Sequence, residues 1–210
     1  MQYVLPGWLA EFRQIYPDVT LEIAVTADYV DLSKRDVDVV IRATSSPPEH
    51  LVGRNTGPWG LAAYASKRYL DRVGRKRPLA DYEWLHYEGQ LRRSPMAKWI
   101  EKNVDEASIK LWFDAFTTLQ SALGAGLGCS ALPCFTGDGD PALEQLPGTY
   151  AMSNSSLWVL THPDLRRSAR IHAFMEFFAT RLVAAREVLI GKRAPATARP
   201  KAATRKRARR

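Results

Sequence analysis

The sequence contains little cysteine and histidine, and these residues form no metal-binding pattern. Of 210 residues, two are cysteines and four are histidines. Cys129 and Cys134 are four residues apart in "GCSALPCF", without the histidine or further cysteine partners of a zinc site. The histidines are scattered, at positions 50, 86, 162 and 172. We predict that both cysteines are small core residues, with a redox pair as the alternative, and that the protein holds no metal and no cofactor.

Long apolar runs are also absent. No segment approaches the ~20 consecutive apolar residues of a membrane-spanning helix. No basic segment followed by an apolar one marks a signal peptide. We therefore expect a cytoplasmic protein with no membrane partner.

The sequence lacks the common catalytic motifs. It contains no G-x-S-x-G, no H-E-x-x-H, no P-loop and no Rossmann glycine pattern. The stretch "GAGLG" at 124–128 resembles a glycine-rich loop, but it ends a helical pattern and leads into a strand, which is the reverse of the order that binds phosphate. We expect that the protein is not an enzyme.

Negative charge is missing from the last twenty residues. Residues 191–210 carry nine of the 30 lysines and arginines and no acidic residue, so the remaining residues hold 21 basic and 22 acidic side chains. The segment is rich in Ala, Pro, Lys and Arg and has no apolar period, which is typical of a disordered tail. We expect either a solubilising extension without further role or an arm that binds nucleic-acid phosphates without sequence preference.

The first 25 residues predict a helix followed by a strand. Apolar residues recur at helical spacing through residues 5–16, and Pro17 ends the pattern. Apolar residues then alternate with other residues over 19–25, which is typical of a strand.

Strands and helices alternate through the rest of the chain. We predict helices over residues 26–36, 67–73, 94–104, 119–126 and 163–190, and strands over 37–42, 59–66, 83–88, 108–113, 128–133 and 155–162. Ser94 is a suitable N-cap with Pro95 as the first helical residue. Asp114, Thr117 or Thr118 is the candidate cap of the helix that follows. The alternation favours an α/β protein with parallel sheets and crossover helices.

The order of these segments resembles the effector-binding domain of LysR-type transcriptional regulators. The resemblance runs from about Tyr3 to Phe178, through "YVLPGWLAEFRQIYPDVTLEI", "DVVIR", "YASKRYLDRVG", "GLGCSALP" and "LWVLTHPDLRRSARIHAFMEFF". It implies a two-lobed fold like that of periplasmic binding proteins of type 2, with two crossover strands. Lobe I is expected over residues 1–82 and 158–190, and lobe II over 83–157. A small effector would bind between the lobes and modulate transcription.

The resemblance also raises an expectation about the start of the sequence. In the family, the helix of residues 5–16 follows the first strand of lobe I, a linker helix and a DNA-reading winged helix-turn-helix. We expect a truncated sensing domain that lacks all three, so that DNA is contacted only through the missing N-terminal domain or nonspecifically through the basic tail. Family effector domains pair side by side, the first helix and following strand against the partner's second lobe, so we expect a homodimer or oligomer.

The candidate effector site lies where strands end. In open α/β sheets ligands bind beyond the carboxyl ends of the strands, often against helix N-termini, and the resemblance points to the same loops. For a small, anionic organic effector the candidates are Thr26, Arg42, Thr44, Tyr87, Ser94, Thr117, Thr118 and Pro133.

Each candidate has a purely structural alternative. The serine and threonines cap helices, Arg42 pairs with a surface carboxylate, or Tyr87 belongs to the core. The family usually places a Ser or Thr at the start of the first helix, where this sequence reads "MQY". Two other functions stay open: a stand-alone solute-binding protein, and a nonfunctional or dominant-negative fragment of a regulator.

Overall fold

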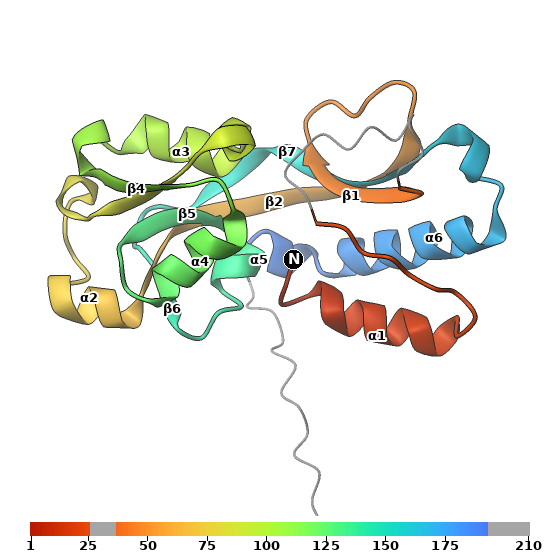
Figure 1. The fold of residues 1–210 in the computed structure, drawn as a ribbon, viewed down its shortest axis with the longest axis horizontal. Coiled ribbons are helices and arrows are strands. Elements are labelled where there is room, and N and C mark those ends of the chain that lie inside the picture. The colour runs from red at the N-terminus through yellow and green to blue at the C-terminus, as the bar shows by residue number, and fades with distance from the viewer. Residues whose placement is uncertain (26–36, 193–210) are drawn as a thin grey trace, which may run out of the picture.

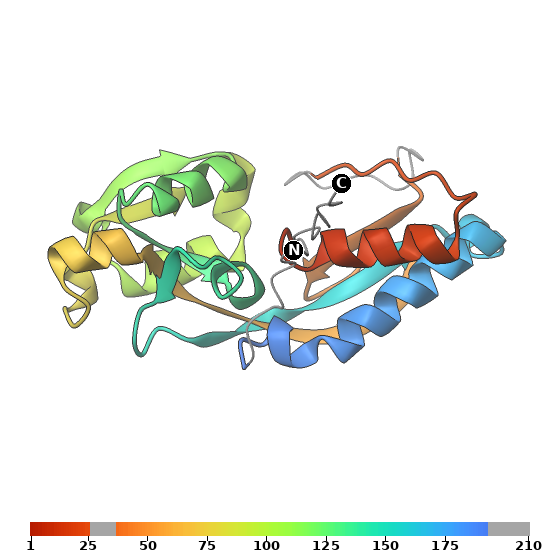
Figure 2. The same cartoon turned by 90° about the horizontal axis from the view of Figure 1, so that it is seen from below.

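The computed structural model describes residues 1–25 and 37–192, which form two lobes joined by two long strands (Figures 1 and 2). The helices are α1 (Leu5–Ile15), α2 (Lys67–Val73), α3 (Pro95–Asn103), α4 (Phe116–Gly124), α5 (Cys134–Gly137), α6 (Ala169–Ala184) and α7 (Arg186–Leu189). The strands are β1 (Val39–Thr44), β2 (Val52–Ser66), β3 (Trp84–Tyr87), β4 (Ile109–Phe113), β5 (Cys129–Pro133), β6 (Leu143–Gln145) and β7 (Ala151–Thr161).

The strands form one mixed sheet that runs through both lobes. Its order is β1-β7-β2-β5-β3-β4, with β6 paired to β2. Among the described strands, β3–β4 and β3–β5 are the parallel pairs, and both lie in lobe II, so the expectation of parallel sheets was wrong for lobe I. There β7 returns from lobe II and lies antiparallel between β1 and β2. The strands β2 and β7 are the two crossover connections (Figure 1).

The crossing into lobe II falls within β2. In Figure 1, α2 lies in lobe II, beside β6. The Tyr69 hydroxyl accepts a hydrogen bond from the Glu83 backbone N–H at 2.9 Å, and Arg72 donates to the Gly126 carbonyl at 3.2 Å. Residues 67–82 therefore pack with lobe II. The chain enters lobe II before residue 67, whereas the sequence predicted the boundary after residue 82.

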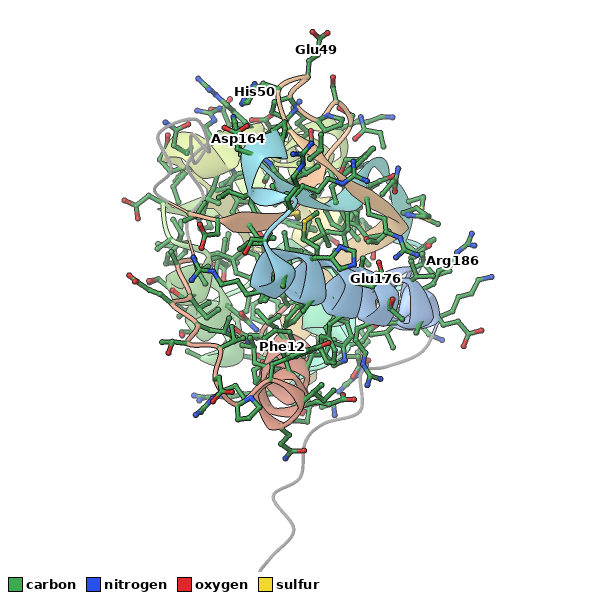
Figure 3. The ribbon with its side chains drawn as sticks, turned by 90° about the vertical axis from the view of Figure 1, so that its right-hand side faces the viewer. Phe12, Glu49, His50, Asp164, Glu176 and Arg186 are labelled. Carbon is green, nitrogen blue, oxygen red and sulfur yellow. The ribbon has the colours of Figure 1, made fainter. Side chains whose placement is uncertain are left out.

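Lobe I is held together by an aromatic cluster between α1 and α6. Phe12 is fully buried, and its ring centroid lies 5.3–5.8 Å from those of Phe174, Phe177 and Phe178. Figure 3 shows Phe12 between the two helices. Glu11 and Arg181 form an ion pair across the same contact. Periodic apolar residues on both helices supply this face, as the sequence predicted.

Lobe II packs tightly where β5 approaches β3. The Cys129 N–H donates to the Glu83 carbonyl at 2.8 Å, immediately after Gly128. A Cβ atom on Gly128 would lie 2.4 Å from that carbonyl oxygen. Because the obstacle is backbone, a side chain at this position would force two strands apart.

We predict that Gly128→Ala lowers the free energy of unfolding by about 1–3 kcal/mol, the usual cost of overpacking. The matched control is Gly124→Ala, where an added Cβ would meet nothing within 4 Å and a helical position gains about 0.5–1 kcal/mol. Urea unfolding followed by circular dichroism measures both. Equal effects of the two substitutions would refute the close approach.

One predicted strand does not form. Residues 19–25 alternate as a strand would, but they have no regular secondary structure, and Val25 is 91% exposed. A strand needs a neighbour for its backbone N–H and C=O groups, and no described strand lies beside this segment. The helix expected over 26–36, and the basic tail from residue 193 onward, lie outside the described residues.

The other predicted elements form, with shifted ends. The strands over 59–66 and 155–162 are longer, as β2 and β7, and β6 was missed. The helix expected over 163–190 is divided into α6 and α7 after a short 3-10 turn at Pro163–Leu165. Ser94 caps α3, and Pro95 is its first residue, as predicted.

Candidate functional site

The carboxyl ends of two parallel strands meet on the side of lobe II that faces lobe I (Figure 1). β3 ends at Tyr87 and β4 at Phe113. The Glu88 N–H donates to the Phe113 carbonyl at 2.8 Å, so the loops after the two strands lie side by side. From these loops begin α3 and α4, and neither helix has an acidic residue in its first turn. The partial positive charge of the two helix N-termini favours negatively charged groups, and the acidic residues nearby, Glu88 and Asp114, lie in the loops that precede the helices.

The first turn of α4 places Thr117 and Thr118 at this edge. Both are exposed, and their hydroxyls make no hydrogen bond within the described residues. The N-cap is Ala115, which has no capping side chain, so the prediction that Asp114, Thr117 or Thr118 caps the helix was wrong. The cap lies one residue after Asp114 and ahead of both threonines. Their hydroxyls are thus available to a ligand.

The cap of α3 uses only part of the hydrogen-bonding capacity of the Ser94 hydroxyl. Its Oγ accepts a hydrogen bond from the Ala97 N–H at 3.2 Å, as an N-cap does. The hydroxyl proton is not used in that bond, and a serine hydroxyl has one proton to donate. Ser94 can therefore cap α3 and donate to a ligand at once.

Tyr87 and Pro133 lie inside lobe II. Tyr87 is fully buried, its hydroxyl donates to the Ala131 carbonyl at 2.7 Å, and its ring stacks on Phe116 at 6.3 Å. Burial raises the pKa of its phenol. Pro133 is buried at the end of β5 and directly precedes α5. The Tyr87 side chain therefore belongs to the core, which is the structural alternative given for this residue. Its ring holds Phe116 in place at the start of α4.

Lobe I contributes the end of β1. Thr44 is its last residue and lies opposite Ser156 of β7. Its hydroxyl is engaged in a local turn, donating to the Ser46 carbonyl at 2.9 Å and accepting from the Ser46 N–H at 3.2 Å. Arg42 lies two residues earlier, opposite Trp158, and is half buried. Thr26 lies outside the described residues.

Residues that the sequence did not single out make the polar contacts at the lobe junction. The Tyr3 hydroxyl donates to Asp140 Oδ2 at 3.0 Å, between the start of α1 and the loop after α5. Tyr64 donates to Asp138 Oδ1 at 2.6 Å, and burial raises the pKa of that carboxyl.

The two cysteines are buried and free. Burial raises the pKa of the Cys134 thiol to about 11, and burial also raises that of Cys129. The thiolate is the reactive form of cysteine. Each thiol is therefore protected both by its protonation state and by its position.

We predict that neither thiol reacts with Ellman's reagent at pH 8 in the folded protein and that both react once urea unfolds it. The folded protein holds the Cys134 thiol proton more tightly than the unfolded chain does. This contribution to stability is fully present below pH ~9, where the thiol is protonated in both states, and it is lost as the pH rises through about 11. Rapid labelling at pH 8 without urea would contradict the buried placement.

The described part of the chain has no group of three or more His, Cys, Asp or Glu residues placed to hold a metal ion. None of its helices is both long and apolar enough to cross a membrane.

Comparison with known proteins identifies relatives of the whole fold. The family model of the LysR substrate binding domain matches residues 1–183. The regulatory domain of CrgA, a LysR-type transcriptional regulator from Neisseria meningitidis, aligns with a TM-score of 0.68 at 20% identity, over 86% of this chain and 93% of that one. The effector domain of the transcriptional regulator AmpR of Pseudomonas aeruginosa aligns with a TM-score of 0.68 at 15% identity, over 87% and 90% of the two chains. At these identities the likeness concerns the fold alone.

Two further matches involve longer proteins. The full-length virulence activator AphB of Vibrio cholerae aligns with a TM-score of 0.60 at 18% identity, over 87% of this chain and 63% of that one. An HTH-type transcriptional regulator of Xanthomonas campestris pv. campestris (strain 8004) is 30% identical over 66 residues, which are 31% of this chain and 19% of that protein. The matched segment is thus a small part of that regulator.

Proposed function

Because the chain belongs to the LysR substrate-binding domain family, we propose that it senses a small organic molecule between its two lobes and thereby modulates transcription. Domains of this family are regulatory rather than catalytic. The proposed activity is therefore binding, without turnover of the ligand.

The observation that carries this proposal is the pair of unoccupied threonine hydroxyls at the start of α4. Thr117 and Thr118 lie beside the loop that follows β3, at the edge of lobe II that faces lobe I (Figure 1). Ligands bind at the carboxyl ends of strands in such sheets. Hydroxyls not spent on capping are the groups with which a protein fixes the orientation of a small ligand.

The charge at this edge favours an anion. The N-termini of α3 and α4 carry partial positive charge and have no acidic residue in the first turn. We propose an organic acid whose carboxylate meets the start of α4, with Ser94 as a second donor.

Effector binding would act through the crossing strands. A ligand that contacts both lobes favours the arrangement in which it makes more contacts, and the equilibrium shifts by that difference in affinity. Because β2 and β7 pass from one lobe into the other, their twist is the natural place for such a change.

The test is a screen of organic acids for a rise in melting temperature, followed by titration calorimetry on the hits. Replacing Thr117 and Thr118 together by valine should weaken binding about tenfold or more, since each lost hydrogen bond to a charged group contributes about 1.5–3 kcal/mol. The control is Thr180→Val, an exposed threonine on α6 whose hydroxyl donates to Glu176 Oε1 at 3.3 Å. A hit whose affinity is unchanged in the double variant would place its site elsewhere.

We further propose that two copies pair side by side. In lobe I, Ile23 and Val25 are 48% and 91% exposed; in lobe II, Leu111 and Trp112 of β4 are 39% and 46% exposed. β4 is an edge strand with one unpaired side, and residues 19–25 have the alternation of a strand without a partner. If residues 19–25 of one copy pair with the free side of β4 in a second copy, the segment and the edge strand both gain a backbone partner. A two-fold axis between the copies produces this contact twice.

A further inference from the structure

A groove of about 610 Å³ lies at the outer end of lobe I, away from the lobe junction. Three segments meet there: the loop before β2 with the start of β2, the end of β7, and the start of α6. Figure 3 shows this end of the molecule, with Glu176 on α6. Its lining includes Arg54 of β2, Trp158 and Leu160 of β7, and Arg166, His172 and Glu176.

The groove is lined by residues from both faces of the sheet at the start of β2. Trp158 and Leu160 are two residues apart in β7, so they lie on the same face of the sheet. Arg54 pairs with the intervening Val159 and faces α6, where its Nη1 meets Glu176 Oε1 at 2.8 Å. Among the described strands, β7 is the one that pairs with this part of β2. At Gly53 the two strands lie close together, since an added Cβ would lie 2.0 Å from the Val159 carbonyl oxygen.

The two parts of the groove differ in chemistry. One part is apolar, formed by Leu51, Trp158 and Leu160. The other holds Arg54, Arg166 and His172 beside a single carboxylate, Glu176. That carboxylate is already engaged with Arg54, which lowers its pKa. His172 also lies near Glu176 and contributes to lowering its pKa, so two arginines and a histidine surround one carboxylate. The charged part therefore carries excess positive charge.

We infer that this groove is a second small-molecule site, which binds an organic anion with a flat or extended apolar body. The body lies against Trp158 and Leu160, and the acid group meets Arg166 and Arg54. The volume falls within the range of known ligand pockets, about 300–1,000 Å³. An apolar wall with a few convergent charged groups is the composition that such pockets share.

The site is separate from the one proposed between the lobes, and its ligand would reach the same crossing strands. It contacts the first residues of β2 and the last residues of β7. Both strands continue into lobe II (Figures 1 and 2). A molecule bound at this end can therefore change the twist of β2 and β7, which carry lobe II at their other ends.

The test uses 1-naphthoate as the probe and 1-naphthamide as its uncharged counterpart. The protein carries 5-fluorotryptophan, and the ¹⁹F signal of Trp158 is assigned with Trp158→Phe. We expect 1-naphthoate to shift the Trp158 signal with saturation and 1-naphthamide to bind at least about tenfold more weakly, since a charge-assisted contact contributes that much.

Substitutions of three exposed residues are expected to change the affinity for 1-naphthoate in different directions. Arg166→Gln should weaken 1-naphthoate binding about tenfold, because it removes a cation of the site. Glu176→Gln should strengthen binding, because it removes the negative charge that competes for Arg54. Arg186→Gln removes an exposed arginine on α7, outside the groove (Figure 3), and should leave the affinity unchanged.

Several results would overturn the inference. One is an unshifted Trp158 signal at the solubility limit of 1-naphthoate. Another is equal binding of the uncharged amide, and a third is insensitivity to both Arg166→Gln and Glu176→Gln. Loss of the Trp158 shift in the Thr117→Val/Thr118→Val double variant would also overturn it, because the probe would then act from the lobe junction. Failure of this site leaves the proposed function untouched, since that function is tested on those two threonines.

Discussion

Phe12→Ala is expected to lower the free energy of unfolding by about 3–5 kcal/mol, the range for removing a buried aromatic ring. Phe12 is fully buried, and its ring meets Phe174, Phe177 and Phe178 of α6. It is the only residue of α1 that is fully shielded from water. Its removal leaves a cavity and weakens the attachment of the whole helix to lobe I.

The control for this prediction lies on the same helix. Ile15 is 53% exposed, so Ile15→Ala should change the stability by about 0.5 kcal/mol or less, as surface substitutions usually do. Urea unfolding at low protein concentration, followed by far-ultraviolet circular dichroism, measures both variants. Similar losses for Phe12→Ala and Ile15→Ala would mean that α1 is not anchored through Phe12.

Trp112→Arg is expected to dissociate the proposed pair of chains. A tryptophan in an interface often contributes about 2–4 kcal/mol to the binding free energy. Its loss therefore raises the dissociation constant roughly 30- to 1,000-fold. The side chain is 46% exposed on the edge strand β4, so an arginine there leaves the single chain folded. Val25→Arg, on the opposite side of the proposed contact, should have the same direction of effect.

Sedimentation over a range of concentrations tests this pairing. Tyr150→Arg is the matched control, because Tyr150 is also 45% exposed but lies outside the two contacting segments. Dissociation by Trp112→Arg and by Val25→Arg, but not by Tyr150→Arg, is the expected pattern. A wild-type chain that stays monomeric at high concentration would contradict the proposal directly.

The periodicity of the sequence was sufficient to predict most helices and strands. The apolar faces of α1 and α6 and the compact runs of β3, β4 and β5 depend on neighbours within a few residues, so the local pattern contains them. The segment of residues 19–25 shows the limit of this reasoning. Its alternation records a preference for strand structure, but a strand also requires a neighbour, which a local pattern does not reveal.

The direction of β7 and the details of the site were beyond local patterns as well. That β7 lies antiparallel between β1 and β2 follows from contacts between residues 90 to 122 positions apart in sequence. The contact of Tyr3 with Asp140 spans 137 residues. The availability of Thr117 and Thr118 depends on where α4 begins, and a difference of one or two residues decides whether a hydroxyl caps the helix or faces a ligand.

The most direct test of the account measures the distance between the lobes with and without an effector. Spin labels are placed on Arg170→Cys in lobe I and Lys98→Cys in lobe II, both exposed positions, while the buried Cys129 and Cys134 stay unlabelled. The ligand is the organic acid that gives the largest thermal stabilisation. The account predicts that saturating ligand shifts and narrows the distance distribution, and that the Thr117→Val/Thr118→Val variant loses the shift. An unchanged distribution with the ligand demonstrably bound would contradict a sensing role.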